Sequence, residues 1–167
     1  AEIFKKMKSN AQIFLNKGYD IKHVDLGGGL GVNYHQNQEI LNLQLVKKEM
    51  DKCYIDVPYK LSFEPGRYLV AKAGILVTSV ITIKNNGGIN YLITDAGMNT
   101  MIRPALYQAH HKIESANGNN KEQINYTVAG PICESSDIFG KKINLPKQQI
   151  GDLIIINDTG AYGKVMA

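Results

Sequence analysis

Five stretches of this sequence place residues with useful chemistry beside glycine or proline. The first is VDLGGGLGVNY, from Val24 to Tyr34, where an apolar run ends in three consecutive glycines. A glycine-rich loop after a parallel strand lets backbone N–H groups approach an anion, and a following helix N-terminus adds a favourable dipole. Phosphate is the usual occupant, although a tight turn could use the same residues. The spacing matches neither the dinucleotide fingerprint nor a Walker loop.

The second and third stretches could face a charged ligand. Glu64-Pro65-Gly66-Arg67 follows a short apolar run, and ligands of parallel α/β folds bind beyond the carboxyl ends of strands. The glutamate and the arginine could therefore contact one ligand from two sides, or form a surface ion pair. Arg103 and Tyr107 stand in an otherwise apolar stretch and could clamp an anion. An arginine that packs its stem beside an acid would give the same pattern.

The last two stretches are loops. Cys133 and Glu134 lie in a turn-rich segment, where a thiol could transfer a proton, whereas a buried cysteine is usually inert. Tyr162, in GAYG, could lay its ring against a ligand or pack over the turn. No metal site is expected, because Cys133 has no partner at ligand spacing. The adjacent His110 and His111 would diverge on a strand.

The elements that must position these residues differ between the two parts of the chain. Apolar residues recur at helical spacing from Ile3 to Leu15, and Gly18 ends that run. Strands are predicted at residues 21–26 and 59–63, with a second helix over residues 38–53. This alternation is typical of a parallel α/β unit. Two strands cannot close such a layer, so residues 1–70 are expected to be the last part of a larger one, or a small unit that docks on something else.

Residues 71–167 have a different character. Residues 74–84 are rich in β-branched side chains, an Asn-Asn-Gly-Gly turn follows, and residues 89–94 would return as the second strand of a hairpin. Further strands are predicted at residues 123–129, 142–145 and 152–157. Polar turns separate them. This part is predicted to be an antiparallel β-barrel or sandwich.

The overall composition excludes several classes of protein. The 167 residues are 44% hydrophobic, which is enough for one or two domains with a core. No apolar run approaches the roughly 18 residues of a membrane span, and no secretory signal is expected, because the first residues lack an uninterrupted apolar run. The net charge of +4 comes from scattered lysines, so no nucleic-acid partner is expected. Two cysteines provide no disulfide framework, and a reducing cytoplasm is the simplest setting.

Taken together and in order, five motifs resemble the C-terminal half of the diaminopimelate decarboxylases: LGGGLGVNY, SFEPGRYLV, DAGMNTMIRPALYQAHH, AGPICESSD and GAYG. That family belongs to the pyridoxal-phosphate (PLP) enzymes with the alanine racemase-like fold. Decarboxylases of ornithine, arginine and carboxynorspermidine share the GGG and EPGR elements, but the Cys-Glu pair and RPALY are more similar to the diaminopimelate branch. The resemblance implies the C-terminal part of a PLP-binding (β/α)8 barrel in residues 1–70, followed by the β-domain in residues 71–167.

The resemblance also implies roles in cofactor binding. Gly28 and Gly29 would offer N–H groups to the phosphate of PLP. Glu64 would pair with the pyridine nitrogen and keep it protonated. The implied cofactor-binding residues are Gly28, Gly29, Glu64, Pro65, Gly66, Arg67 and Tyr162.

For the substrate, the resemblance implies contacts with the distal end of an amino acid. Arg67, Arg103 and Tyr107 would hold its distal carboxylate, where a bidentate guanidinium suits a planar anion. Glu134 would accept from its distal ammonium. Cys133 would be the general acid that reprotonates the α-carbon. The implied substrate-binding residues are Arg67, Arg103, Tyr107, Glu134 and Tyr162.

The implied reaction is decarboxylation of meso-2,6-diaminopimelate to L-lysine by a homodimer, with the Cys-Glu loop entering the partner's active site. Two alternatives remain: another basic amino-acid decarboxylase of this fold, and a non-catalytic binding module on the same scaffold. The family's Schiff-base lysine would lie upstream of every residue shown, and no lysine here stands in a matching motif. We therefore expect a piece of a longer protein that decarboxylates little on its own.

Overall fold

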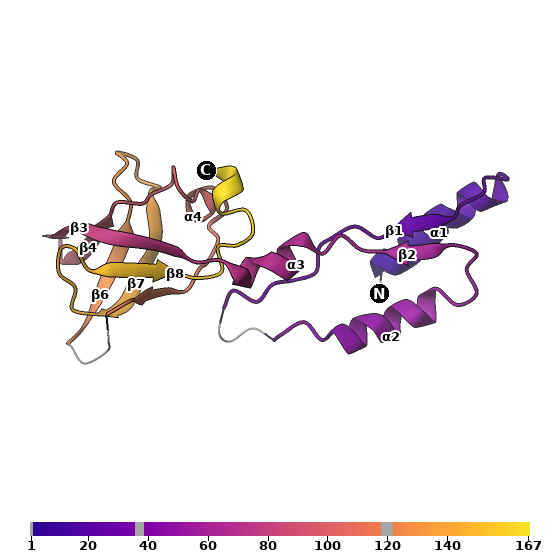
Figure 1. The fold of residues 1–167 in the computed structure, drawn as a ribbon, viewed down its shortest axis with the longest axis horizontal. Coiled ribbons are helices and arrows are strands. Elements are labelled where there is room, and N and C mark those ends of the chain that lie inside the picture. Colours follow the sequence, from indigo (N-terminus) through magenta and orange to yellow (C-terminus); the bar gives the residue numbers. More distant parts are fainter. Residues whose placement is uncertain (1, 36–38, 118–121) are drawn as a thin grey trace. The chain divides into compact units, whose positions relative to one another are not determined.

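A computed structural model describes residues 2–35, 39–117 and 122–167 (Figure 1). The chain divides into two compact units. Unit 1 comprises residues 1–32 and 39–68, and unit 2 comprises residues 33–38 and 69–167. Each unit has its own hydrophobic core.

Unit 1 alternates helix and strand, as the sequence predicts. Its elements are α1 (Glu2–Asn16), β1 (His23–Asp25), α2 (Leu43–Cys53) and β2 (Lys60–Ser62). The two strands pair in parallel, with Val24 opposite Leu61. Gly18 ends α1 in a left-handed conformation, φ +86°, which glycine adopts without steric cost. Both outer edges of this two-stranded sheet are unpaired among the described residues.

Helix α2 begins later than the predicted residues 38–53. It starts after Asn42, whose side chain accepts a hydrogen bond from the amide of Leu45 at 3.1 Å. Such an N-cap satisfies one of the free amides of the first turn and so fixes where a helix begins. Residues 39–42 are therefore not helical, and Gln38 lies outside the described residues.

The core of unit 1 packs the helices against the strands. Tyr54, at the end of α2, donates its hydroxyl to the backbone carbonyl of Phe4 on α1 at 3.0 Å. Burial raises the pKa of Tyr54 to about 12. The neutral hydroxyl thus stays a donor and ties the two helices together. The buried apolar residues of this core are Phe4, Ala11, Val24, Leu26, Tyr54 and Tyr59.

The chain passes from unit 1 to unit 2 through two short helices, α3 (Gly66–Val70) and η1 (Ala71–Ala73). Unit 2 then forms a six-stranded sheet in the order β5-β8-β3-β4-β6-β7. Its strands are β3 (Leu76–Asn86), β4 (Ile89–Thr94), β5 (Ile113–Ser115), β6 (Gln123–Ala129), β7 (Ile138–Pro146) and β8 (Leu153–Ile156). The predicted hairpin of β3 and β4 turns at Gly87 and Gly88, both with positive φ.

The sheet is not purely antiparallel, which corrects one detail of the prediction. Strands β4 and β6 run parallel, with Leu92 opposite Val128. A parallel pair needs a crossover connection, and the segment between them holds α4 (Arg103–Tyr107) and β5. Neither α4 nor β5 was predicted from the sequence. The DAGMNT and RPALY stretches lie on this crossover, which begins at the C-terminal end of β4.

The sheet curls so that its two edge strands, β5 and β7, come close together. A Cβ on Gly140 of β7 would lie 3.0 Å from the Ile113 side chain of β5 and 2.8 Å from that of Ile143. The missing side chain therefore lets the edges approach each other closely. The curled sheet encloses a core that includes Leu92, Val128, Ile154 and Ile156.

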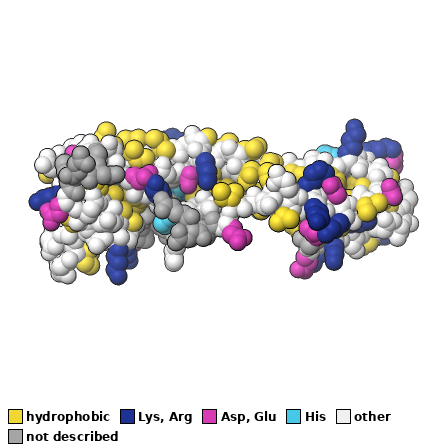
Figure 2. All heavy atoms as spheres, turned by 90° about the horizontal axis from the view of Figure 1, so that it is seen from below, with side chains coloured by type: hydrophobic (Ala, Val, Ile, Leu, Met, Phe, Trp, Pro, Cys, Tyr) yellow, Lys and Arg dark blue, Asp and Glu magenta, His cyan; other side chains and the backbone are white. Residues whose placement is uncertain are grey.

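Charged side chains of both signs are interspersed on the face shown in Figure 2. Several lysines sit in exposed ion pairs, such as Lys47 with Asp51 and Lys52 with Glu49 on α2. Exposed pairs of this kind contribute little to stability. In the described parts of the chain, no helix is both long and apolar enough to cross a membrane.

Candidate functional site

The glycine turn of unit 1 follows β1 and is held by one carboxylate. Gly27 and Gly29 have φ of +71° and +83°, a region that favours glycine. Asp25 Oδ1 accepts from the Gly27 amide at 2.6 Å, and Asp25 Oδ2 accepts from the Ser62 hydroxyl at 2.8 Å. These bonds hold the pKa of Asp25 below its usual value. The carboxylate thus stays charged and keeps the turn in place.

The amides of Gly28 and Gly29 remain available for a ligand. Both glycines are exposed, and no described residue accepts a hydrogen bond from their N–H groups. Backbone N–H groups in such a turn form a concave site for an anion. The Asp25 carboxylate is engaged with Gly27 and Ser62. The turn therefore offers donors of the type that a phosphate accepts.

The EPGR stretch lies directly beside this turn. The Glu64 amide donates to Gly27 O at 2.9 Å, which continues the parallel pairing of β1 and β2 by one step. A Cβ on Gly28 would lie 2.7 Å from the backbone oxygen of Glu64. Only glycine fits there. The structure thus brings together two stretches that are separate in the sequence, at the carboxyl ends of both strands.

The rest of EPGR forms a tight turn into α3. The Gly66 amide donates to Glu64 O at 2.8 Å, and Pro65 between them fixes its own backbone angle. Glu64 is exposed and Arg67 is half-buried in the first turn of α3. All six predicted site residues of this part, Gly28, Gly29, Glu64, Pro65, Gly66 and Arg67, lie in unit 1.

Unit 2 holds a buried arginine that has no acidic partner. Arg103, at the start of α4, is 7% exposed, and no described carboxylate pairs with it. Its Cζ lies 5.6 Å from the ring centroid of Tyr34 and 5.9 Å from that of Tyr162. Cation–π contacts of this kind lower the free-energy cost of burying the positive charge. A guanidinium without a counter-ion in such a place is suited to bind a carboxylate.

The side chain of His111 contacts the same arginine at Nε. Arg103 Nε donates to His111 Nε2 at 3.5 Å, and His111 Nδ1 lies 2.9 Å from Asn157 O. Because a carbonyl can only accept, Nδ1 carries the proton and Nε2 is the acceptor. His111 is 1% exposed, and burial lowers its pKa. The Tyr34 ring meets the His111 ring edge-on at 5.2 Å.

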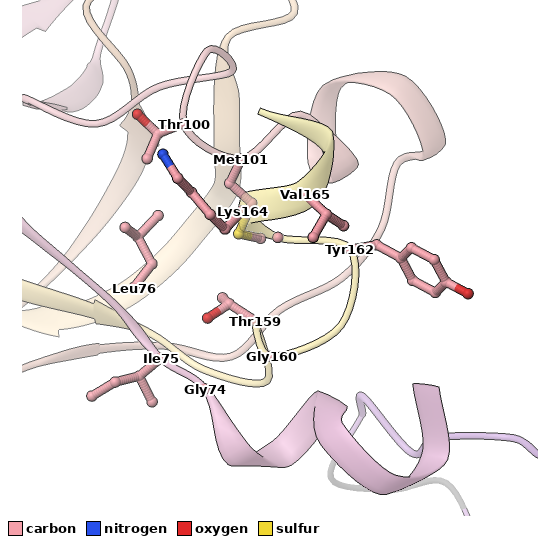
Figure 3. Close-up of a pocket in the computed structure, with 11 residues that line it drawn as sticks. Gly74, Ile75, Leu76, Thr100, Met101, Thr159, Gly160, Tyr162, Lys164 and Val165 are labelled. Atoms are coloured by element: carbon pink, nitrogen blue, oxygen red, sulfur yellow. The ribbon is translucent and has the colours of Figure 1, made fainter. Parts of the chain in front are cut away.

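Tyr162 is held in an unusual backbone conformation. Its φ is +57°, which is uncommon for a residue with a side chain and marks local strain. The loop is fixed because Gly160 donates to Ala71 O at 2.9 Å, and a Cβ on Gly160 would lie 1.9 Å from Val70 O. Tyr162 is 48% exposed. Its ring points away from the cavity of about 270 Å³ beside it (Figure 3), and towards Arg103 instead.

Tyr107 does not join this cluster. It follows Arg103 by one turn of α4 but is 59% exposed. Arg103, by contrast, is buried. The structure therefore separates the environments of two residues that the sequence grouped as one clamp.

The loop that carries Cys133 and Glu134 is anchored by Asp137. Asp137 is 3% exposed, and its carboxylate accepts from the Met98 amide at 2.6 Å and from the Ile132 amide at 2.8 Å. A Cβ on Gly130 would lie 2.3 Å from this carboxylate. The loop is thus fixed to the DAGMNT turn.

At the tip of this loop a free thiol lies next to an ionised carboxylate. Cys133 is exposed and unpaired. Glu134 Oε1 accepts from the Ser136 amide at 3.2 Å and from the hydroxyls of Ser135 and Ser136. These bonds lower the pKa of Glu134. The tip can therefore offer a thiol proton and a negative charge to a ligand.

Four residues with a role in these sites were missed by the sequence reasoning: Tyr34, His111, Asp25 and Asp137. All of them lie in or beside the motifs already singled out, but their burial and partners are set by tertiary contacts. Among the described residues, no group of three or more His, Cys, Asp and Glu side chains could hold a metal.

Comparison with known families places the chain in a class. The family model described as "Pyridoxal-dependent decarboxylase, C-terminal sheet domain" matches residues 19–160. The matched range includes the glycine turn, the EPGR stretch, Arg103 and the Cys-Glu loop. The chain therefore belongs to the pyridoxal-dependent decarboxylases, whose cofactor is PLP, and the predicted resemblance is confirmed.

Within that family, curated relatives with similar sequences include diaminopimelate decarboxylases. One from Bacteroides thetaiotaomicron is 43% identical over 150 residues, which is 88% of this chain and 39% of the relative. One from Escherichia coli K12 is 36% identical over 168 residues, covering 90% and 40%. The chain thus spans about 40% of the length of these curated relatives.

Solved structures of diaminopimelate decarboxylases are also similar to this chain. The crystal structure of a diaminopimelate decarboxylase from M. jannaschii matches 99% of this chain and 39% of its own, with 37% identity and a TM-score of 0.92. The Helicobacter pylori enzyme complexed with L-lysine matches 98% of this chain and 40% of its own, with 38% identity and a TM-score of 0.89.

The residues of unit 1 fit the phosphate of PLP. The exposed amides of Gly28 and Gly29 point to an anion rather than a cation, since N–H groups only donate. A side chain on Gly28 would fill the space beside Glu64.

Proposed function

We propose that this chain serves in the PLP-dependent decarboxylation of meso-2,6-diaminopimelate to L-lysine. The observation that supports this most directly is Arg103, a buried guanidinium flanked by two tyrosine rings and without a carboxylate partner among the described residues. The relatives at 36–43% identity carry the name of this activity, and one of the matching structures holds L-lysine. L-lysine keeps the distal carboxylate of the substrate, which is the group that Arg103 would bind.

In the proposed site, the residues of unit 1 hold the cofactor. Gly28 and Gly29 donate their amides to its phosphate, beside the turn made by Pro65, Gly66 and Arg67. The carboxylate of Glu64 pairs with the pyridine nitrogen and keeps a proton there. When bound, PLP supplies an electron sink for the electrons left when carbon dioxide departs.

The residues of unit 2 hold the substrate and handle the proton. Arg103 binds the distal carboxylate, and Tyr162 packs against the ligand. Glu134, ionised on its loop, accepts from the distal ammonium. The Cys133 thiol donates a proton to the α-carbon after carbon dioxide has left.

We further propose that two copies of the protein share their active sites and that the protein works in the cytoplasm. The Cys133 loop is exposed and rigidly anchored by Asp137, as suits a segment that reaches into a partner's site. A homodimer with the loop exchanged would complete each site, and a closed two-fold pair is the commonest oligomer.

The test is the reaction itself with the full-length native protein. We expect PLP-loaded protein to release carbon dioxide and L-lysine from meso-diaminopimelate, and to prefer it to ornithine and arginine. Arg103→Ala should raise KM strongly, because the distal carboxylate loses its cation. A preference for ornithine or arginine would overturn the substrate assignment. Binding of these amino acids without turnover of any would favour a non-catalytic module instead.

A further inference from the structure

The hydrogen bond between Arg103 and His111 suggests a role for His111, which is not among the proposed substrate-binding residues. Arg103 has five N–H donors in a planar fork. One of them, Nε–H, points to His111 Nε2, and His111 is in turn held by Asn157 O. The terminal nitrogens have no partner among the described residues. The guanidinium is thus fixed at Nε, and its two terminal nitrogens remain available to a ligand.

We propose that His111, as a neutral imidazole, is a positioning residue that aims the Arg103 guanidinium at the substrate's distal carboxylate. This inference rests on the proposed function, in which Arg103 binds that group. His111 itself does not touch the substrate. It acts through Arg103 by accepting from Nε, so that both terminal nitrogens face the ligand in the bidentate arrangement that carboxylates favour.

An imidazole suits this position better than an acid does. A carboxylate behind Arg103 would hold the guanidinium equally well but would neutralise it. The arginine would then attract the substrate's carboxylate less. A neutral acceptor orients the guanidinium and leaves its full charge for the ligand. The burial of Arg103 without an acid among the described residues agrees with this arrangement.

The surroundings of His111 favour its neutral form. Its ring is buried, and the positive charges or rings that face it are Arg103, His110 and the edge of Tyr34. Asp158 and the carbonyl of Asn157 act in the opposite direction, but the balance lowers its pKa. A protonated His111 would turn an N–H toward Arg103, lose the acceptor, and place two positive charges side by side.

The Tyr34 ring contacts both members of this pair. It packs against His111 and lies over Arg103, and its hydroxyl is buried without a partner among the described residues. A ring at this position limits the movement of both side chains. His111 and Tyr34 together therefore restrict the guanidinium.

The experiment compares two ligands that differ in one carboxylate. L-lysine has it, and cadaverine, its decarboxylated form, does not. In the full-length PLP-loaded protein, we expect His111→Ala to weaken L-lysine binding about tenfold, the equivalent of one charge-assisted hydrogen bond. Cadaverine binding should not change. His111→Gln, whose amide oxygen can accept from Nε, should restore most of the affinity, and His110→Gln is the matched neighbour control.

Other results would separate the two proposals. If Arg103→Ala weakens L-lysine but His111→Ala does not, the positioning role is wrong and the proposed function stands. If Arg103→Ala leaves L-lysine binding unchanged, the binding role of Arg103 in the proposed function fails. Equal weakening of L-lysine and cadaverine by His111→Ala would mean a purely structural role. In the wild type, L-lysine affinity should fall as the pH drops through the lowered pKa of His111, and in His111→Gln it should fall less.

Discussion

Asp25 and Ser62 face each other across the two parallel strands of unit 1, with the serine hydroxyl donating to the aspartate at 2.8 Å. The other oxygen of the same carboxylate accepts from the Gly27 amide at 2.6 Å. One side chain therefore links the glycine turn to the strand that leads into Glu64. The two halves of the proposed cofactor site are held in register by this link.

Loss of that link should loosen the proposed cofactor site. We expect Asp25→Ala to weaken PLP binding about tenfold in the full-length protein, because the Gly27 amide and the Ser62 hydroxyl lose their acceptor. Ser62→Ala removes only one of the two bonds and should have a smaller effect. Equilibrium dialysis of PLP measures both. Faster hydrogen exchange at Gly27 in Asp25→Ala would confirm the cause, and unchanged affinity would contradict it.

A side chain at Gly28 should be excluded by sterics. The Cβ of Gly28→Ala would meet the Glu64 carbonyl at 2.7 Å, so one of the two turns must move. We expect a loss of about 1–3 kcal/mol in the free energy of unfolding, together with weaker PLP binding. Gly31→Ala is the matched control, since nothing lies within 4 Å of its Cβ. Urea titration should separate the two variants, and equal stability would show that the turn can yield.

The buried carboxylate of Asp137 should be needed for the Cys-Glu loop. Asp137→Asn would put an amide nitrogen against one of two backbone donors, and we expect a cost of about 1–3 kcal/mol. The loop should also become mobile. With Cys53 replaced by serine in both proteins, the rate at which Cys133 is alkylated should therefore differ between Asp137→Asn and the parent. Glu122→Gln, an exposed acid, serves as the control. An unchanged alkylation rate and melting temperature in Asp137→Asn would argue against an anchor.

Stability should depend on pH through His111. Its pKa is lower in the folded chain than the usual 6.5, so the unfolded chain binds more protons in the range just below 6.5. The free energy of unfolding of unit 2 should thus rise with pH across that range. The stability that His111 contributes is lost as the pH falls. In urea titrations between pH 5 and 7.5, the free energy of unfolding should change less steeply with pH in His111→Gln than in the wild type. An identical slope in both proteins would assign the dependence to other groups, such as His110, whose pKa is also lowered.

A shared active site can be detected by mixing variants. Cys133→Ala and Arg103→Ala should each be nearly inactive as pure dimers. In a mixed dimer, one site would receive its arginine from one copy and its cysteine from the other. Recovery of about a quarter of wild-type activity after mixing and re-equilibration is the expected result. No recovery in a preparation shown to contain mixed dimers would place both residues in the same copy's site.

Much of this fold can be predicted from local patterns. The Asn-Asn-Gly-Gly turn predicts the hairpin of β3 and β4, because both glycines take the positive φ that such a turn needs. The helical repeat that ends at Gly18 predicts α1. The N-terminus of α2 was missed although Asn42 carries a capping signal, since the apolar repeat alone ran further back.

Other features depend on contacts that no local pattern encodes. The parallel pairing of β4 and β6 follows from a crossover that contains only a five-residue helix and a three-residue strand. The burial of Arg103 and the exposure of Tyr107 depend on how α4 packs. The acceptor role of His111 depends on Asn157, which is 46 residues away in the sequence. The motifs thus locate the chemistry, and the tertiary packing decides which residues meet.

The two open edges of the β1–β2 pair have a practical consequence. Each edge presents amide and carbonyl groups that no described strand pairs with. Such an edge is a template on which another chain can add a strand, so purified samples of this chain should self-associate as their concentration rises. Lys60, at the start of β2, adds exposed positive charge, which opposes that addition. Low salt, where this repulsion is least screened, is therefore the condition in which to handle the chain.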